Sequence, residues 1–334
     1  MTDTSLKPLI VLPLKVGLVG TGYAARLRAE TLKTDPRTSL VAVAGHTLEK
    51  TQEFCQIYGA TMIESWEALV TSPLVDLVII CTVNRDHGVI ARAALEARKH
   101  VIVEYPLALD VFEAEKLVVL AQSQNCLLHV EHIELLSGVH QALKASLPQI
   151  GAVFYARYAT IKPELPVPQR WSYHQELFGF PLMGALSRLH RLTDLFGPVN
   201  TVNCQNRYQK RDSTDSYYTA CLCTSQLGFD SGLIAEVTYG KGETFWQTER
   251  KFEVHGKKGA LILDGEQGTL IQADSRYPIE VGSRRGLFAK DTTMVLDYLT
   301  TGSPLYITPA ESLYTLKVAD AARRSAEEGK TIQL

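Results

Sequence analysis

The segment Gly20-Thr-Gly22-Tyr-Ala-Ala25 has the spacing of a turn that holds a dinucleotide. Gly20 permits a tight turn, Gly22 leaves room for a pyrophosphate to approach the backbone, and Ala25 lets the next helix pack close to the preceding strand. A helix that begins here directs free N–H groups and the positive end of its dipole at the phosphates. We therefore expect the cofactor to contact Gly20, Thr21, Gly22, Tyr23 and Ala24.

The residues after the second strand, Leu40–Ala44, indicate which nicotinamide cofactor is bound. An NAD enzyme usually places Asp or Glu here, to accept hydrogen bonds from the ribose hydroxyls. This chain has Gly45-His46-Thr47 instead. His46, Thr47 and Lys50 could contact a 2′-phosphate, although Thr47 could equally cap the following helix. The sequence therefore favours NADPH over NADH.

Strand and helix patterns alternate as far as residue 130, which predicts a parallel Rossmann sheet. The buried strand Val75–Ile80 and the strand beginning at His100 both end in polar residues. Because ligands of open α/β sheets bind beyond the carboxyl ends of the strands, we expect the nicotinamide to lie at these ends. The residues that would contact it are Thr82, Val83, Asn84, His87, Glu104 and Tyr105.

The second half of the chain has strand-like alternation in most segments, which predicts a large, mostly antiparallel open sheet. We expect domains at 1–130 and 131–334, the second of α+β type. The expected strands are 153–161, 201–207, 217–227, 233–239, 251–255 and 259–263. The expected helices are 182–196, 292–300 and 309–328, and the C-terminal helix could pack back on the first domain.

Composition excludes several classes of protein. The 334 residues are 46% hydrophobic and 21% charged with a net charge of −2, so a nucleic-acid-binding surface is not indicated. No stretch is apolar enough to span a membrane, and Leu9–Leu14 is too short for a signal peptide, so we expect a cytosolic protein. The six cysteines form no C-x-x-C motif, and we expect no metal site. The oligomeric state stays open.

A Rossmann half that ends in a Glu-x-Pro strand, followed by a mostly antiparallel half, resembles the Gfo/Idh/MocA oxidoreductase family. Members usually carry Glu-Lys-Pro, where the Lys assists catalysis on sugar-like alcohols, but this chain has Glu104-Tyr105-Pro106. Many also carry Asp and His four residues apart on a helix; here Arg188 and Leu192 take those positions, and His190 is offset. Because the usual base is missing, the resemblance does not favour sugar dehydrogenation.

The altered residues resemble one branch of that family, the biliverdin reductases. The similar segments are Val103–Pro106, His129–Leu136, Phe178–Leu189 and Leu195–Gly197. This resemblance implies NADPH-dependent reduction of biliverdin IXα to bilirubin IXα, with hydride delivered to the C10 methine bridge. The zinc-binding Cys/His tail of the mammalian enzymes has no counterpart in Gly329–Leu334, which suggests the bacterial or cyanobacterial type.

The resemblance also suggests catalytic roles for Arg188, Tyr105 and Glu104. A guanidinium near the tetrapyrrole would stabilise the negative charge that hydride addition brings, so we expect Arg188 to be catalytic. A propionate clamp or a simple surface charge are the alternatives. Tyr105 could donate a proton, stack on the substrate or only shape the pocket. Glu104 could hold nicotinamide or ribose, or act as a helix-cap partner.

Further residues are candidates for binding the tetrapyrrole. Glu131 and Glu134 could share a helical face near the substrate or lie on a solvated face. Cations are needed for the two propionates, and aromatic rings could stack on the tetrapyrrole or belong to the core. The candidate cations are Arg207, Arg211, Arg250 and Lys251. The candidate stacking residues are Phe245, Trp246 and Tyr239.

Two other functions remain open. One is an NADP-dependent oxidoreductase of the same fold that acts on another small carbonyl or imine. The other is a bilin- or nucleotide-binding protein without turnover, which Glu104, Tyr105 and Arg188 together disfavour.

Overall fold

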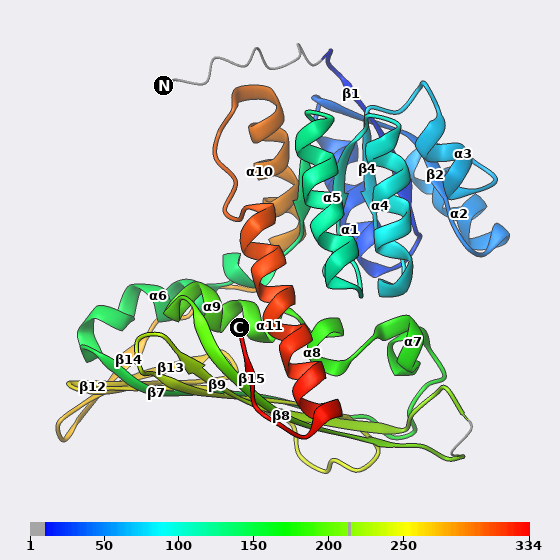
Figure 1. Ribbon diagram of the computed structural model, residues 1–334. Coiled ribbons are helices and arrows are strands. Elements are labelled where there is room, and N and C mark those ends of the chain that lie inside the picture. The colour runs from blue at the N-terminus through cyan, green and yellow to red at the C-terminus, as the bar shows by residue number, and fades with distance from the viewer. Residues whose placement is uncertain (1–10, 213–214) are drawn as a thin grey trace.

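The computed structural model describes residues 11–212 and 215–334. Two sheets form the framework of the chain (Figure 1). The first has six parallel strands in the order β3-β2-β1-β4-β5-β6. Its strands are β1 (Leu14–Val19), β2 (Thr38–Ala44), β3 (Thr61–Met62), β4 (Leu77–Ile80), β5 (His100–Val103) and β6 (Leu128–Val130).

The strand order reverses beside β1, and this crevice is where a doubly wound sheet binds its ligand. Because both faces of the sheet are covered by helices, its central strands are continuously apolar; all four residues of β4 are fully buried. The helices are α1 (Tyr23–Thr34), α2 (Leu48–Tyr58), α3 (Trp66–Thr71), α4 (His87–Glu96) and α5 (Val111–Ser123), with a 3-10 turn η1 (Asn84–Asp86) before α4.

The second sheet has nine strands in the order β14-β13-β12-β11-β7-β10-β9-β8-β15. Only β7 and β10 run parallel; the other neighbours are antiparallel. The strands are β7 (Val153–Pro163), β8 (Val199–Gln209), β9 (Ala220–Phe229), β10 (Ile234–Gly242), β11 (Glu249–Gly256), β12 (Gly259–Asp264), β13 (Gln267–Gln272), β14 (Ser275–Ile279) and β15 (Ile332–Gln333).

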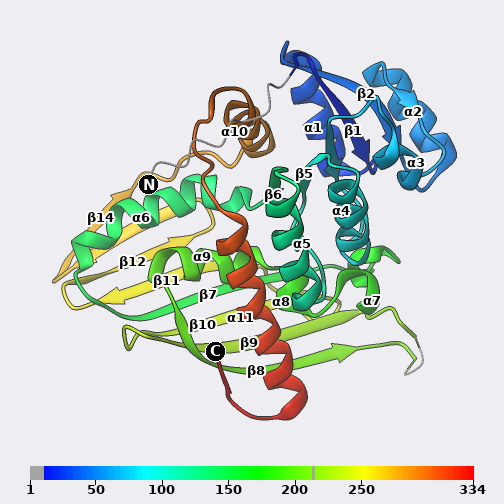
Figure 2. The same cartoon turned by 45° about the horizontal axis from the view of Figure 1, so that its top comes forward.

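One face of this sheet carries helices and is directed towards the Rossmann half (Figures 1 and 2). These helices are α6 (Gly138–Ile150), α8 (Pro181–Gly184), α9 (Ser187–Phe196) and α11 (Pro309–Glu328). Two short elements, η3 (Trp171–Tyr173) and α7 (Gln175–Phe178), and a turn η2 (Ile133–Leu136) lie between the sheets. The helical face therefore forms the floor of the space between the two halves.

Helix α10 (Leu287–Thr301) returns to the Rossmann half and packs on α1. A buried network holds it there. Arg28 donates to Asp291 over 2.8 Å and to Glu104 over 2.8 Å. His129 and Tyr306 also bond Asp291, each over 2.7 Å. Because Arg28 and Asp291 are fully buried, this network fixes the end of β5, and with it Glu104, against α1.

The parallel sheet and the antiparallel second sheet agree with the sequence prediction, with differences in detail. The helix expected over 182–196 is broken between α8 and α9. The ring of Phe178 lies so close to Gly184 that a Cβ there would be 2.5 Å from it, so this turn is packed around a glycine. The sequence analysis missed α6 and the edge hairpin of β13 and β14. None of the helices in the described ranges combines the length and apolar composition that a membrane span requires.

Candidate active site

A cavity of about 1040 Å³ runs from the glycine turn at β1 to the short elements η2, η3, α7 and α8. We call it the main cavity. Its walls include all the residues that the sequence analysis assigned to the cofactor, together with Glu131 and Glu134. The assigned residues are Gly20, Thr21, Gly22, Tyr23, Ala24, His46, Thr47, Lys50, Thr82, Val83, Asn84, His87, Glu104 and Tyr105.

The two glycines of the turn have different surroundings. Gly20 has φ +114°, and a Cβ there would lie 2.3 Å from the carbonyl oxygen of Cys81, so only glycine fits. A Cβ on Gly22 would meet nothing within 4 Å, because Gly22 faces the main cavity. No side chain caps the start of α1, so its first N–H groups are directed at the same space. These features fit the pyrophosphate of a dinucleotide.

The far end of this cavity wall carries His46, Thr47 and Lys50. Although Thr47 precedes α2, its hydroxyl makes no capping hydrogen bond to that helix, so the structural alternative for Thr47 does not hold in the described chain. His46 and Lys50 are exposed. The sequence analysis missed Glu64, Ser65 and Trp66, which line the cavity after β3 and carried no recognisable motif.

The side chain of His87 connects the segments that follow β4 and β5. Its ring nitrogens lie 2.8 Å from the carbonyl oxygen of Pro106 and 3.3 Å from that of Thr82. Burial lowers the pKa of His87, so the ring is neutral. Asn84 donates to the carbonyl oxygen of Phe178 over 2.9 Å. Both side chains therefore hold the backbone around the expected nicotinamide site.

Tyr105 lines the main cavity, and its hydroxyl is directed at α9. Its hydroxyl is 3.2 Å from Ser187 Oγ, and its ring stacks on His132 with centroids 5.5 Å apart. Burial raises the pKa of Tyr105 to about 12, so the phenol keeps its proton at neutral pH. Tyr105 is therefore a hydrogen-bond donor that points at the helix carrying Arg188.

Arg188 also contacts the Ser187 hydroxyl that lies beside Tyr105. Its Nη1 donates to Ser187 Oγ over 2.9 Å, its Nε donates to Thr160 Oγ1 over 3.4 Å, and its guanidinium lies 5.4 Å from the ring centre of Tyr239. Arg188 does not line the main cavity, but Ser187 connects it to Tyr105, which does. The structure thus brings two of the three candidate catalytic side chains, Tyr105 and Arg188, together at one edge of the cavity.

Glu134 is surrounded by arginines beside this edge. It pairs with Arg191 and Arg284, and Arg250 lies 3.5 Å from it. Burial alone would raise the pKa of Glu134, but Arg191, Arg284 and Arg188 lower it overall, so Glu134 is ionised. One carboxylate among these cations leaves an excess of positive charge. The sequence analysis proposed only Arg250 of this group; Arg284 lies in a loop without a motif.

Glu131 has the opposite electrostatics. It is 1% exposed, and its Oε1 accepts from the backbone of Ile133 over 2.5 Å. Burial, with Glu104 and Asp291 nearby, raises its pKa well above that of a free glutamate. Neither Glu131 nor Glu134 therefore lies on a solvated face.

Several expected substrate residues lie elsewhere. Phe245 packs against Gly240, where a Cβ would be 2.7 Å from its ring. Because successive residues of a strand point to opposite faces, Gly240 and Phe245 lie on the face opposite Tyr239. Trp246 is 87% exposed, and neither aromatic residue lines the main cavity. Arg207, on the outer face of β8, is exposed as well. In the described ranges, no group of three or more His, Cys, Asp or Glu side chains could hold a metal ion.

With this geometry in view, the chain can be compared with known proteins. Residues 14–132 match the model of the Gfo/Idh/MocA oxidoreductase family, NAD-binding Rossmann fold, and residues 147–334 match the model of its C-terminal alpha/beta domain. This chain belongs to the Gfo/Idh/MocA oxidoreductase family. It is therefore an oxidoreductase whose Rossmann half binds a nicotinamide dinucleotide.

One solved structure shares both halves at high identity. A biliverdin reductase from Synechocystis sp. PCC 6803, in complex with biliverdin and NADP+, is 53% identical with a TM-score of 0.93, covering 94% of this chain and 99% of that one. Biliverdin reductase A of Mus musculus is 32% identical over 59% of this chain and 63% of its own length. The Homo sapiens protein is 31% identical over 63% of this chain and 67% of its own length. The chain thus spans somewhat less than two thirds of the mouse protein.

Proposed function

We propose that this chain reduces biliverdin IXα to bilirubin IXα with NADPH. The observation that supports it best is the link Tyr105–Ser187–Arg188 at the edge of the main cavity, in a chain 53% identical to a biliverdin reductase. The family's usual lysine is replaced there by Tyr105 and its usual aspartate by Arg188, which donate hydrogen bonds but do not act as bases at neutral pH, and Leu192 replaces its histidine. Such a site suits reduction of a conjugated acceptor better than oxidation of an alcohol.

NADPH is the proposed cofactor. Gly20 and Gly22 would hold its pyrophosphate, while Thr47 and Lys50 would meet its 2′-phosphate at the end of the wall where Gly45-His46-Thr47, without a carboxylate, directly follows β2. When bound, NADPH supplies the hydride that is delivered to the C10 methine bridge. Glu104, held by Arg28 over 2.8 Å, would help to orient the nicotinamide beside Thr82 and Asn84.

The protein's part in the reaction is electrostatic. Hydride addition at C10 brings negative charge into the tetrapyrrole, and a pyrrole nitrogen must gain a proton. Arg188 keeps its positive charge at every accessible pH and is already oriented by Ser187, so it stabilises that charge without reorganising. Tyr105, whose phenol is protonated, is available to donate a hydrogen bond to the substrate.

The excess positive charge around Glu134 suits the two propionates of biliverdin. Arg250 and Arg284 have about a third of their side chains exposed, so they can reach a ligand, whereas Arg191 is buried and would act through Glu134. Guanidinium groups bind carboxylates in a bidentate manner, which fixes orientation as well as position. We infer that this cluster orients the tetrapyrrole over the main cavity. A cytosolic location is part of the proposal, since all six cysteines are free thiols.

An anaerobic spectrum of the protein mixed with biliverdin and NADPH tests the proposal. Loss of the biliverdin band, with a matching rise of bilirubin and loss of NADPH, is expected. Consumption of NADPH with another small carbonyl or imine, but none with biliverdin, would favour a different oxidoreductase. A shifted biliverdin spectrum with no consumption of NADPH would indicate a carrier without turnover.

A further inference from the structure

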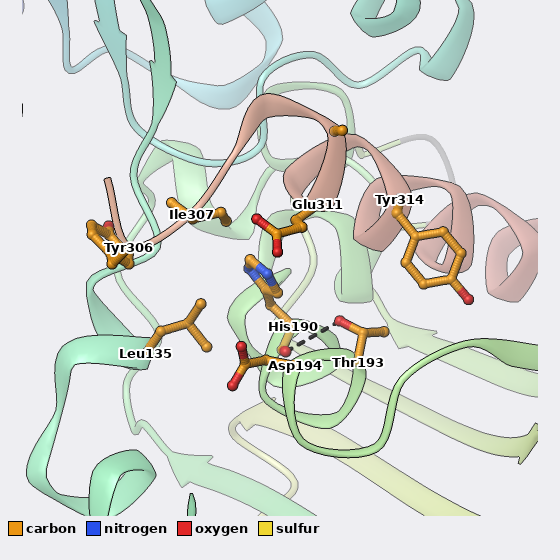
Figure 3. A pocket seen from close by; sticks show the side chains of 9 residues that line it. Leu135, His190, Thr193, Asp194, Tyr306, Ile307, Glu311 and Tyr314 are labelled. Atoms are coloured by element: carbon orange, nitrogen blue, oxygen red, sulfur yellow. Dashed lines mark hydrogen bonds between the residues drawn. The ribbon is translucent and has the colours of Figure 1, made fainter. Parts of the chain in front are cut away.

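A second, smaller cavity is lined by His190, Thr193 and Asp194 of α9 (Figure 3). Its volume is about 330 Å³, at the lower end of the range for small-molecule sites, and it shares no lining residue with the main cavity. Residues of η2, α9 and the start of α11 enclose it. One part of its wall is apolar, formed by Leu135, Ile307 and the ring of Tyr314.

The polar part of the wall carries two carboxylates, Asp194 and Glu311. Asp194 is paired with Lys144 over 3.1 Å and accepts from His140 over 2.7 Å. Glu311 uses Oε2 to accept from the backbone and hydroxyl of Thr308, each over 2.7 Å, and no described residue donates to its Oε1. Lys144 balances the charge of Asp194, whereas the carboxylate of Glu311, exposed in the first turn of α11, is paired with no Lys, Arg or His side chain in the described ranges.

His190 points into this cavity between the two carboxylates (Figure 3). It is 3% exposed, and its Nδ1 is buried without a hydrogen-bond partner in the described structure. Burial lowers the pKa of His190 to about 4, so the ring is neutral and has a free acceptor nitrogen. A neutral imidazole has one acceptor nitrogen, and a ligand that donates a hydrogen bond could use it.

We propose that the small cavity binds a small organic monocation, a primary ammonium group with an apolar body. The ammonium would donate to Glu311 Oε1 and to the imidazole of His190, while the apolar body would pack on Leu135, Ile307 and Tyr314. This occupant matches the carboxylate of Glu311, the neutral acceptor and the apolar wall at once. An anion or a strongly polar neutral molecule matches only part of the wall.

The site touches the candidate active site through stacked rings. The His190 ring meets the His132 ring edge to face, with centroids 4.0 Å apart, and His132 stacks on Tyr105. His132 is held in turn by Ser312 on α11, next to Glu311, over 2.9 Å. The occupant would therefore lie two rings away from Tyr105 without entering the main cavity.

Calorimetric titration of the full chain with phenethylammonium tests the proposal. We expect binding that 2-phenylethanol and phenylacetate, the neutral and anionic analogues, do not reproduce. Saturating NADP+ is expected to leave the binding unchanged, because the two cavities share no wall. Glu311→Gln preserves the capping of α11, since glutamine can also accept from Thr308, and is expected to weaken binding about tenfold or more. Ala310→Leu, at the exposed mouth, is expected to abolish it.

The matched control is Glu328→Gln, an exposed glutamate on the same helix about 25 Å from Glu311 at 1.5 Å per residue. It is expected to bind phenethylammonium like the original chain. Circular dichroism and the melting temperature check that each variant is folded. The proposal is overturned if phenethylammonium does not bind, if its neutral analogue binds equally well, if NADP+ competes with it, or if Glu311→Gln and Glu328→Gln behave alike.

Discussion

Replacing Arg188 is the sharpest perturbation of the proposed chemistry. The guanidinium is held by Ser187 over 2.9 Å and lies against the ring of Tyr239, so its charge is preorganised. A unit charge about 4 Å away is worth about 4 kcal/mol at an effective dielectric constant of about 20. Since Arg188 is only half-buried, we expect its charge to stabilise the transition state by about 2–4 kcal/mol. Arg188→Ala should therefore lower kcat by about 30- to 1000-fold.

Single-turnover reduction of biliverdin, followed by absorbance, measures this effect. The dissociation constant of NADPH, measured separately by fluorescence, is expected to change less than threefold, because Arg188 does not line the main cavity. Arg188→Lys keeps the charge but loses the fork, so about tenfold of the rate should be lost. Arg207→Ala, on the exposed outer face of the second sheet, away from α9, is the control and should leave kcat unchanged. A kcat of Arg188→Ala within threefold of the original would remove Arg188 from the mechanism.

Four more predictions concern the cofactor, the phenol, the buried network and acid stability. Lys50→Ala should weaken NADPH about tenfold and NADH hardly at all, by fluorescence titration; equal effects would refute the 2′-phosphate assignment. Tyr105→Phe should lower kcat about tenfold, and since the pKa of Tyr105 is about 12, the original chain should show no loss of activity from this group up to pH 10. Asp291→Ala should destabilise the fold by about 3–5 kcal/mol in urea, because it removes one of the two carboxylates that pair with the buried Arg28 and leaves His129 and Tyr306 without their acceptor; a loss under 1 kcal/mol would contradict the network. Burial would raise the pKa of Asp194, but His140 and Lys144 lower it to about 2. Its contribution to stability is therefore present above the unfolded-state pKa of about 3.9 and is lost as the pH falls towards 2. In Asp194→Asn, the free energy of unfolding should depend less on pH in that range.

The cofactor half could be predicted in detail because its signals are local. The glycine turn, the apolar β4 and the polar strand ends each specify their own conformation, and the parallel sheet then brings the strand ends to one edge. All the residues assigned to the cofactor line one cavity for this reason. The residues missed there, Glu64 and Trp66, follow the two-residue strand β3, which is too short to show a period.

The residues proposed to bind the substrate were harder to predict from the sequence, because they come together only through the tertiary fold. Arg250, on β11, meets Glu134, on η2, across 116 positions of the chain, and nothing near either residue indicates the pairing. Phe245 follows β10, and its ring packs against Gly240 on the outer face of the second sheet. Sequence composition does not indicate this placement. The break after Gly184 depends on the ring of Phe178, a contact that helix propensity alone does not specify.

The central claim is tested most directly by the position of the transferred hydrogen. The protein is mixed anaerobically with biliverdin and NADPH deuterated at the transferable position of the nicotinamide, and the product is examined by mass spectrometry and NMR. The proposal predicts bilirubin with one deuterium at C10. Bilirubin labelled elsewhere, unlabelled bilirubin, or no bilirubin at all would contradict it.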